Sequence, residues 1–164
     1  MQKLPIGIQT FEKIRNGNYI YIDKTDLALD LIENYQYAFL SRPRRFGKSL
    51  FLDTLHNIFE AKQELFAGLA IYDKWDWSKK YPVIKISWGG ESYVSIEDTQ
   101  KKAFFILENN QERLGINCKK DDSPSICFAR LIKEAYEKYQ KRVVVLIDEY
   151  DKPILNNKIS QLLL

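Results

Sequence analysis

The sequence predicts an α/β fold with a mainly parallel sheet, because short apolar strand patterns alternate with longer helical ones. The strand patterns lie at Tyr37–Leu40, Val83–Ser87 and Val143–Ile147. Between them, apolar residues recur every three or four positions, which is typical of helices that cover a sheet. Every residue of Val143–Ile147 is apolar. That pattern is typical of a strand buried on both faces, so we expect a three-layer αβα arrangement.

Helical spacing indicates five helices, with a β-rich run at Tyr19–Ile22 between the first two. The second helix can be capped by either Asp23 or Thr25, since both residue types accept hydrogen bonds from first-turn amides. The fifth follows Ser123-Pro124, a common helix opening. The five helices are expected at Phe11–Arg15, Asp23–Glu33, Leu50–Phe59, Ile96–Leu114 and Ser125–Tyr139.

Composition indicates one globular unit in a reducing compartment. The chain has 164 residues, is 45% hydrophobic and carries a net charge of +3, which is too small for a general polyanion binder. Its two cysteines, Cys118 and Cys127, form no CxxC pair, and there is one histidine. We therefore expect plain thiols, without a zinc site or a disulfide. With neither a signal-peptide pattern nor a long apolar run, the sequence predicts a cytoplasmic protein.

A phosphate-binding loop is predicted at Arg42–Ser49, between the first strand pattern and the helix that follows it. The motif GxxxxGK[ST] cradles phosphates with backbone amides, places lysine on the terminal phosphates and places a hydroxyl on Mg²⁺. Gly47, Lys48 and Ser49 match its end, whereas Arg42 replaces its first glycine. We assign phosphate contact to the seven residues Arg44, Arg45, Phe46, Gly47, Lys48, Ser49 and Leu50, with Ser49 also a magnesium ligand.

Two carboxylates follow the last strand pattern, as in a Walker B motif. Asp148 is predicted to hold Mg²⁺, usually through water, and Glu149 to polarise the water that attacks the γ-phosphate. Parallel sheets bind ligands at the carboxyl ends of their strands, where both motifs are expected to lie. Lys48 and Glu149 are therefore the predicted catalytic residues.

The segments SRPRRFGKSL (41–50) and VVVLIDEYDKPI (143–154) resemble the bacterial AAA-ATPase-like family, and residues 3–25 resemble its N-terminal lead. The resemblance implies a P-loop NTPase of the ASCE/AAA type, with Arg42 a family trait. It also implies that residues 1–164 form a partial ATPase domain, with a lead at 1–36 and a P-loop core through Walker B at 37–164. We expect this domain to be incomplete at its C-terminus, where longer members often carry a PD-(D/E)XK nuclease-like domain.

The leading functional prediction is magnesium-dependent ATP binding, with hydrolysis in the complete domain. An alternative is an ATP-binding switch or interaction module with little turnover. A third is a nucleic-acid-binding accessory that uses the arginines of the phosphate loop. The apolar end of the chain at 159–164 further predicts either poor solubility or dependence on a missing partner segment.

Overall fold

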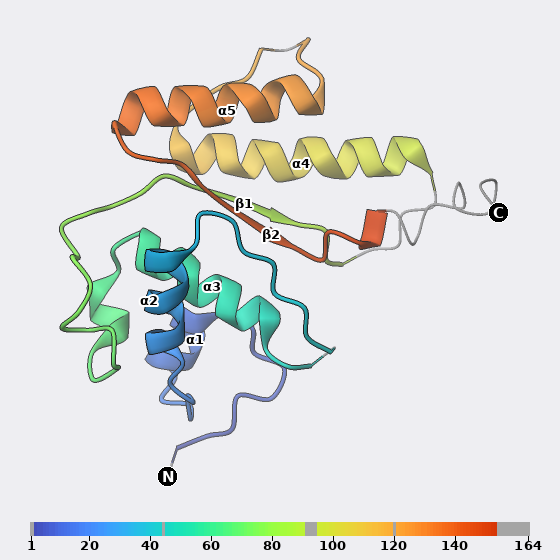
Figure 1. The fold of residues 1–164 in the computed structure, drawn as a ribbon. Coiled ribbons are helices and arrows are strands. Elements are labelled where there is room, and N and C mark those ends of the chain that lie inside the picture. Colours follow the sequence, from blue (N-terminus) through green and yellow to red (C-terminus); the bar gives the residue numbers. More distant parts are fainter. Residues whose placement is uncertain (1, 44, 91–94, 120, 154–164) are drawn as a thin grey trace. The chain divides into compact units, whose positions relative to one another are not determined.

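The computed structural model describes residues 2–43, 45–90, 95–119 and 121–153. Arg44 and the apolar end at 159–164, both named above, lie outside the described residues. The chain divides into two compact units, Met1–Lys80 and Tyr81–Leu164, and each is considered by itself (Figure 1). None of the described helices combines the length and apolar character needed to cross a membrane.

The first unit is helical. It contains α1 (Phe11–Asn16), α2 (Thr25–Asn34), α3 (Lys48–Phe59) and the short 3-10 helix η1 (Gln63–Phe66). Its core is formed by side chains from all four helices and the loop after η1, all of them buried: Phe11, Ile14, Ala28, Leu55, Ile58, Phe66 and Ile71. The predicted helices at Phe11–Arg15 and Asp23–Glu33 are confirmed, and the third begins two residues earlier than its apolar pattern.

Buried polar contacts fix α3, the helix that follows the phosphate loop. The Asp53 carboxylate accepts a 2.8 Å hydrogen bond from the backbone N–H of Phe11, across 42 residues of sequence. Asn57 donates to the Asp53 carbonyl at 2.6 Å. The bond from Phe11 holds α3 to the start of α1, because a buried acceptor that loses its donor is destabilising, and the bond from Asn57 lies within α3. The phosphate loop therefore leads into a well-anchored helix.

The second unit is a small parallel sheet with two long helices on one side. Strands β1 (Val83–Ser87) and β2 (Val144–Asp148) pair in parallel, with Val83 opposite Val144 and Ser87 opposite Asp148. Helices α4 (Ile96–Leu114) and α5 (Pro124–Tyr139) lie together over one face of these strands (Figure 1). The core between them is made of Ile84, Leu107, Leu114, Ile116, Cys127, Leu131 and Ala135. A mixed α/β fold with parallel strands is thus confirmed.

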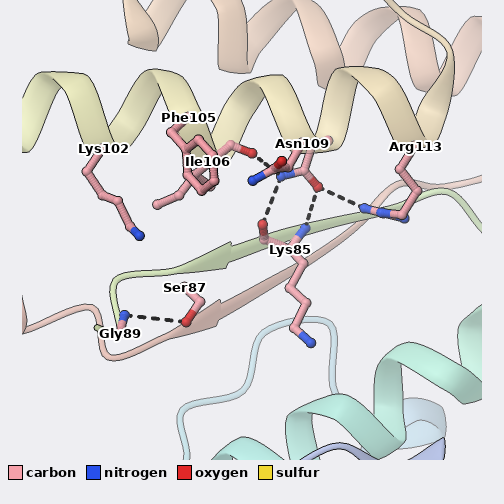
Figure 2. A pocket seen from close by; sticks show the side chains of 9 residues that line it. Lys85, Ser87, Gly89, Lys102, Phe105, Ile106, Asn109 and Arg113 are labelled. Atoms are coloured by element: carbon pink, nitrogen blue, oxygen red, sulfur yellow. Dashed lines mark hydrogen bonds between the residues drawn. The ribbon is translucent and has the colours of Figure 1, made fainter. Parts of the chain in front are cut away.

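The outer edge of β1 is closed by side chains of α4. The Asn110 amide accepts a hydrogen bond from Lys85 N and donates one to Lys85 O, both at 2.8 Å. Arg113 donates to the carbonyl of Val83, and Figure 2 shows its guanidinium beside the strand. These groups take the place of a neighbouring strand. Along Val83–Lys85 the edge of β1 is therefore already paired.

Two strand predictions are wrong. Tyr37–Leu40 forms no strand, and Tyr37 and Phe39 are 86% and 72% exposed. An extended segment becomes a strand only when a neighbour pairs with its backbone, and the described residues of the first unit contain no strand. The run at Tyr19–Ile22 likewise forms a single bridge, from Tyr19 to Lys3.

The prediction that β2 is buried on both faces is also wrong. Val145 and Ile147 are 36% and 48% exposed, whereas Ile84, the residue opposite Val145, is fully buried. Among the described elements α4 packs mainly on β1, so the face of β2 beside it is covered incompletely.

The cysteines are not plain thiols. Cys118 and Cys127 form a disulfide, with their Cα atoms 5.3 Å apart. Cys127 belongs to the first turns of α5 and Cys118 to the loop before it, and both pack in the core of the second unit. A separation of nine residues without a CxxC motif carries no local signal for such a pair, so the tertiary packing creates it.

Candidate nucleotide-binding site

The phosphate loop reverses direction through two residues in the left-handed backbone region. Gly47 has φ 75° and immediately precedes α3, and Arg45 has φ 69°. A Cβ added at Gly47 would meet no atom within 4 Å, so glycine is needed there for its backbone freedom and not for space. Arg45 lacks that freedom, and its conformation costs about 1–2 kcal/mol. Strained residues of this kind are often found at ligand sites.

The first amides of α3 have no acceptor within the helix. Lys48 is the first helical residue, and no side chain caps the helix. The Gly47 carbonyl accepts the first helical hydrogen bond, from Phe51 N at 2.9 Å. The amides of Lys48, Ser49 and Leu50 precede this bond and therefore have no acceptor within the helix. Free N–H groups together with the helix dipole favour an anion at this end.

Lys48 folds back across the loop. Its ammonium donates to the carbonyl of Arg42 at 2.5 Å, six residues earlier in the chain. Arg42, Arg45, Phe46 and Gly47 are all exposed to solvent, so a ligand has access to the loop. The Lys48 ammonium and the first amides of α3 thus belong to one accessible segment, and both kinds of group bind phosphate oxygens.

The predicted acidic pair lies at the carboxyl end of β2. Asp148 is the last residue of the strand, opposite Ser87, and its carbonyl accepts a hydrogen bond from Trp88 N at 3.2 Å. Glu149 follows in the left-handed region, with φ 52°, and its N–H donates to Asp148 Oδ1 at 3.0 Å. The two carboxylates therefore occupy a tight turn at the strand end, where parallel sheets bind ligands.

Three further residues, which we did not predict from the sequence, surround the acidic turn. Ser87 ends the neighbouring strand, Gly89 lies beside the Glu149 carboxylate, and Lys152 forms an ion pair with it at 2.8 Å. A polar residue that ends an apolar strand is a usable signal for Ser87. Gly89 and Lys152 have no such signal, because only the fold of the turn brings them to Glu149.

A cavity of about 400 Å³ adjoins this end of β1. Figure 2 shows Lys102 and Phe105 of α4 on one side, Ser87 and Gly89 on the other, and the Lys85 side chain pointing away from the helix. Lys102 Nζ lies 5.3 Å from the centre of the Phe105 ring. The cavity therefore has a cationic and aromatic wall on α4 and a polar wall on β1.

The donors present suit ATP and Mg²⁺. Helix amides and Lys48 are the usual partners of phosphate, and Mg²⁺ in nucleotide sites takes few protein oxygens beside water and phosphate. The Ser49 hydroxyl and the Asp148 carboxylate are oxygens of that type. Among the described residues, no cluster of three or more His, Cys, Asp or Glu side chains forms a metal site. The phosphate loop and the acidic turn belong to different units.

Comparison with known proteins identifies the class of protein. Residues 5–163 match the family described as a predicted AAA-ATPase, and the chain belongs to that family. It is also 52% identical over 157 residues to an uncharacterised protein in the vnfD 5′ region of Azotobacter chroococcum. That match covers 95% of this chain and 30% of the relative, so the chain spans under a third of the longer protein. No solved structure matches the chain.

Proposed function

We propose that this chain binds Mg·ATP through its phosphate loop. The observation that carries the proposal is the opening of α3: a left-handed glycine, an uncapped helix N-terminus and a lysine ammonium held over the loop. The amides from Arg45 to Leu50 would contact phosphate oxygens, and Lys48 would neutralise charge on the β and γ phosphates. Arg44 joins this set on its sequence position alone. Membership of the family supports ATP as the nucleotide.

The proposal extends to hydrolysis in the complete domain. Mg²⁺, bound by the Ser49 hydroxyl and by Asp148, would offset phosphate charge. Glu149 would accept a proton from water as the water oxygen bonds to the γ-phosphorus and the bond to ADP breaks. Support for hydrolysis comes from the family and from the place of Asp148 at the end of a parallel strand. Because Tyr37–Leu40 forms no strand, the segment before the phosphate loop gives no such support.

The remainder of a longer protein would supply further parts. Since this chain covers 30% of its Azotobacter relative, the process that ATP drives belongs to the whole protein. A nuclease-like domain behind the ATPase is the partner that we propose, on the family resemblance alone. Cytoplasmic location is likewise a proposal.

Two substitutions test the binding and hydrolysis steps separately. Lys48→Ala is expected to reduce ATP affinity by at least tenfold, since a hydrogen bond to a charged group contributes about 1.5–3 kcal/mol. Lys13→Ala, which removes an exposed lysine from α1, is the matched control. Affinity is measured by isothermal titration with Mg·ATP. Equal affinity in the Lys48 and Lys13 variants would refute the assignment of the loop.

Glu149→Gln is expected to keep ATP affinity and to lose hydrolysis in the full-length protein, because the amide cannot accept a proton. A single-turnover assay with labelled ATP measures this. Binding without hydrolysis in the unsubstituted full-length protein would instead support the nucleotide-dependent switch.

A further inference from the structure

The turn after β2 closes around Glu149 through its backbone. The Glu149 carbonyl accepts a hydrogen bond from Lys152 N at 3.1 Å, while its own N–H bonds to Asp148. Glu149 adopts φ 52°, which costs a non-glycine residue about 1–2 kcal/mol. Such a conformation persists only where the surroundings hold it. The direction in which the Glu149 side chain leaves the backbone is therefore well defined.

The end of the Glu149 side chain is held by charge. Its Oε2 atom is buried and lies 2.8 Å from the Lys152 ammonium, without the geometry of a directed hydrogen bond. The two side chains are 39% and 32% exposed, so solvent screens the pair only in part. Lys152 thus bonds to Glu149 with its backbone and pairs with it through its side chain.

Gly89, in the loop after β1, leaves room for the same carboxylate. A Cβ added there would lie 2.7 Å from Glu149 Oε2. Gly89 is not in the left-handed region, so a larger residue fits its backbone. What glycine provides at this position is the absence of a side chain, and the carboxylate takes that space.

We propose that Lys152 is a positioning residue for Glu149, and that Gly89 provides the space in which Lys152 holds the carboxylate. The inference rests on the proposed role of Glu149 in activating water. A glutamate side chain has three rotatable bonds, and a general base acts efficiently only within a narrow range of positions. With Oε2 fixed between Lys152 and Gly89, the carboxylate keeps one orientation from turnover to turnover.

Three variants test this proposal in the full-length protein. Lys152→Met removes the cation, Lys152→Arg restores a cation, and Gly89→Ala places a methyl group 2.7 Å from the present position of Oε2, too close for the carboxylate to stay there. Lys133→Met is the matched control, because it removes the cation of another ion pair in the same unit, with Glu137 at 4.0 Å. Turnover and ATP affinity are measured for each. The amide signal of Gly89 in a nitrogen–proton NMR spectrum reports the carboxylate without any need for hydrolysis.

Lys152→Met and Gly89→Ala are each expected to lower turnover roughly tenfold with unchanged ATP affinity, since displacement of a catalytic group by a fraction of an ångström has effects of this size. Lys152→Arg should recover most of the turnover. The Gly89 signal should move in Lys152→Met as it does in Glu149→Gln, and stay in place in Lys133→Met.

Two results would overturn the positioning role. One is a Gly89 signal that Lys152→Met leaves unmoved. The other is full turnover in Lys152→Met and Gly89→Ala in a protein whose Glu149→Gln variant has lost hydrolysis. Failure of the proposed function looks different, because Glu149→Gln would then hydrolyse ATP normally, and the NMR comparison would still decide whether Lys152 holds the carboxylate.

Discussion

Replacing Gly47 by alanine tests whether the backbone of the phosphate loop binds phosphate, separately from its effect on the stability of the protein. Gly47 has φ 75°, and a Cβ there would meet no atom within 4 Å. The substitution therefore adds no clash, and its effect on stability is the strain of a left-handed alanine, about 1–2 kcal/mol. For a chain of this size, that strain lowers the melting temperature by roughly 2–8 °C if the loop keeps its shape.

The loop can relieve this strain by rotating away from the left-handed region, and the amides of Lys48 and Ser49 would then point elsewhere. Each hydrogen bond to phosphate that is lost reduces ATP affinity by about tenfold or more. Gly68 is a matched control, since it lies in the same unit, has φ 76° and also has open space at its Cβ. Gly68→Ala should lose stability and keep its affinity for ATP.

The assay pairs thermal unfolding with isothermal titration of Mg·ATP on the unsubstituted protein and both alanine variants. We expect Gly47→Ala to lose less stability than Gly68→Ala, because its loop relaxes, and to lose affinity for ATP tenfold or more. If Gly47→Ala melts near the temperature of the unsubstituted protein, so that its loop has relaxed, and still binds ATP as tightly, the backbone of the loop does not form the phosphate site. The reasoning from the left-handed glycine would then be refuted.

Three further predictions concern stability. Asn110→Ala should reduce the free energy of unfolding by about 1–3 kcal/mol in urea, because both backbone groups of Lys85 lose a partner, whereas Asn109→Ala should have little effect. Asp23 accepts bonds from the start of α2, and although burial acts to raise its pKa, these bonds and one from Ala70 hold it below the usual range. A carboxyl group whose pKa is lower in the folded protein stabilises the fold at pH values above its pKa in the unfolded chain, near 4. Asp23→Asn should therefore reduce the free energy of unfolding by about 0.5–1 kcal/mol at pH 7. This difference should disappear in acid, as the pH falls through the lowered pKa of Asp23. Reducing the disulfide between Cys118 and Cys127 should destabilise the protein by about 2–3 kcal/mol, and Cys118→Ser should show the same loss without reductant.

The elements of the second unit were predictable because their signals are local. Ile96–Leu114 and Val83–Ser87 agree with the structure at both ends, since each has a clear apolar period and a defined start, Ser95 before the helix and Pro82 before the strand. The opening of α3 was also predictable, because Gly47, Lys48 and Ser49 stand directly before a helical pattern, the context in which this motif begins a helix.

Other features depend on contacts between distant residues and could not be predicted in this way. The apolar run Tyr37–Leu40 resembles a strand, but pairing decides whether it becomes one. The disulfide and the contact between Lys152 and Glu149 arise from the packing of α5 and from the turn after β2. A single sequence lists the residues that form such contacts but does not show which of them lie close together in the fold.

Because the edge of β1 is already paired with α4, a further strand can join the sheet only beside β2. With Val83 and Lys85 already bonded to α4, a new strand, whether from this protein or from another molecule, finds no free ladder on that side. Any strand added to the pair would have to join β2 instead, beside the carboxylates of Asp148 and Glu149. Asn110 and Arg113 thus occupy the edge of β1 along Val83–Lys85 and leave enlargement of the sheet to the side that carries the acidic turn.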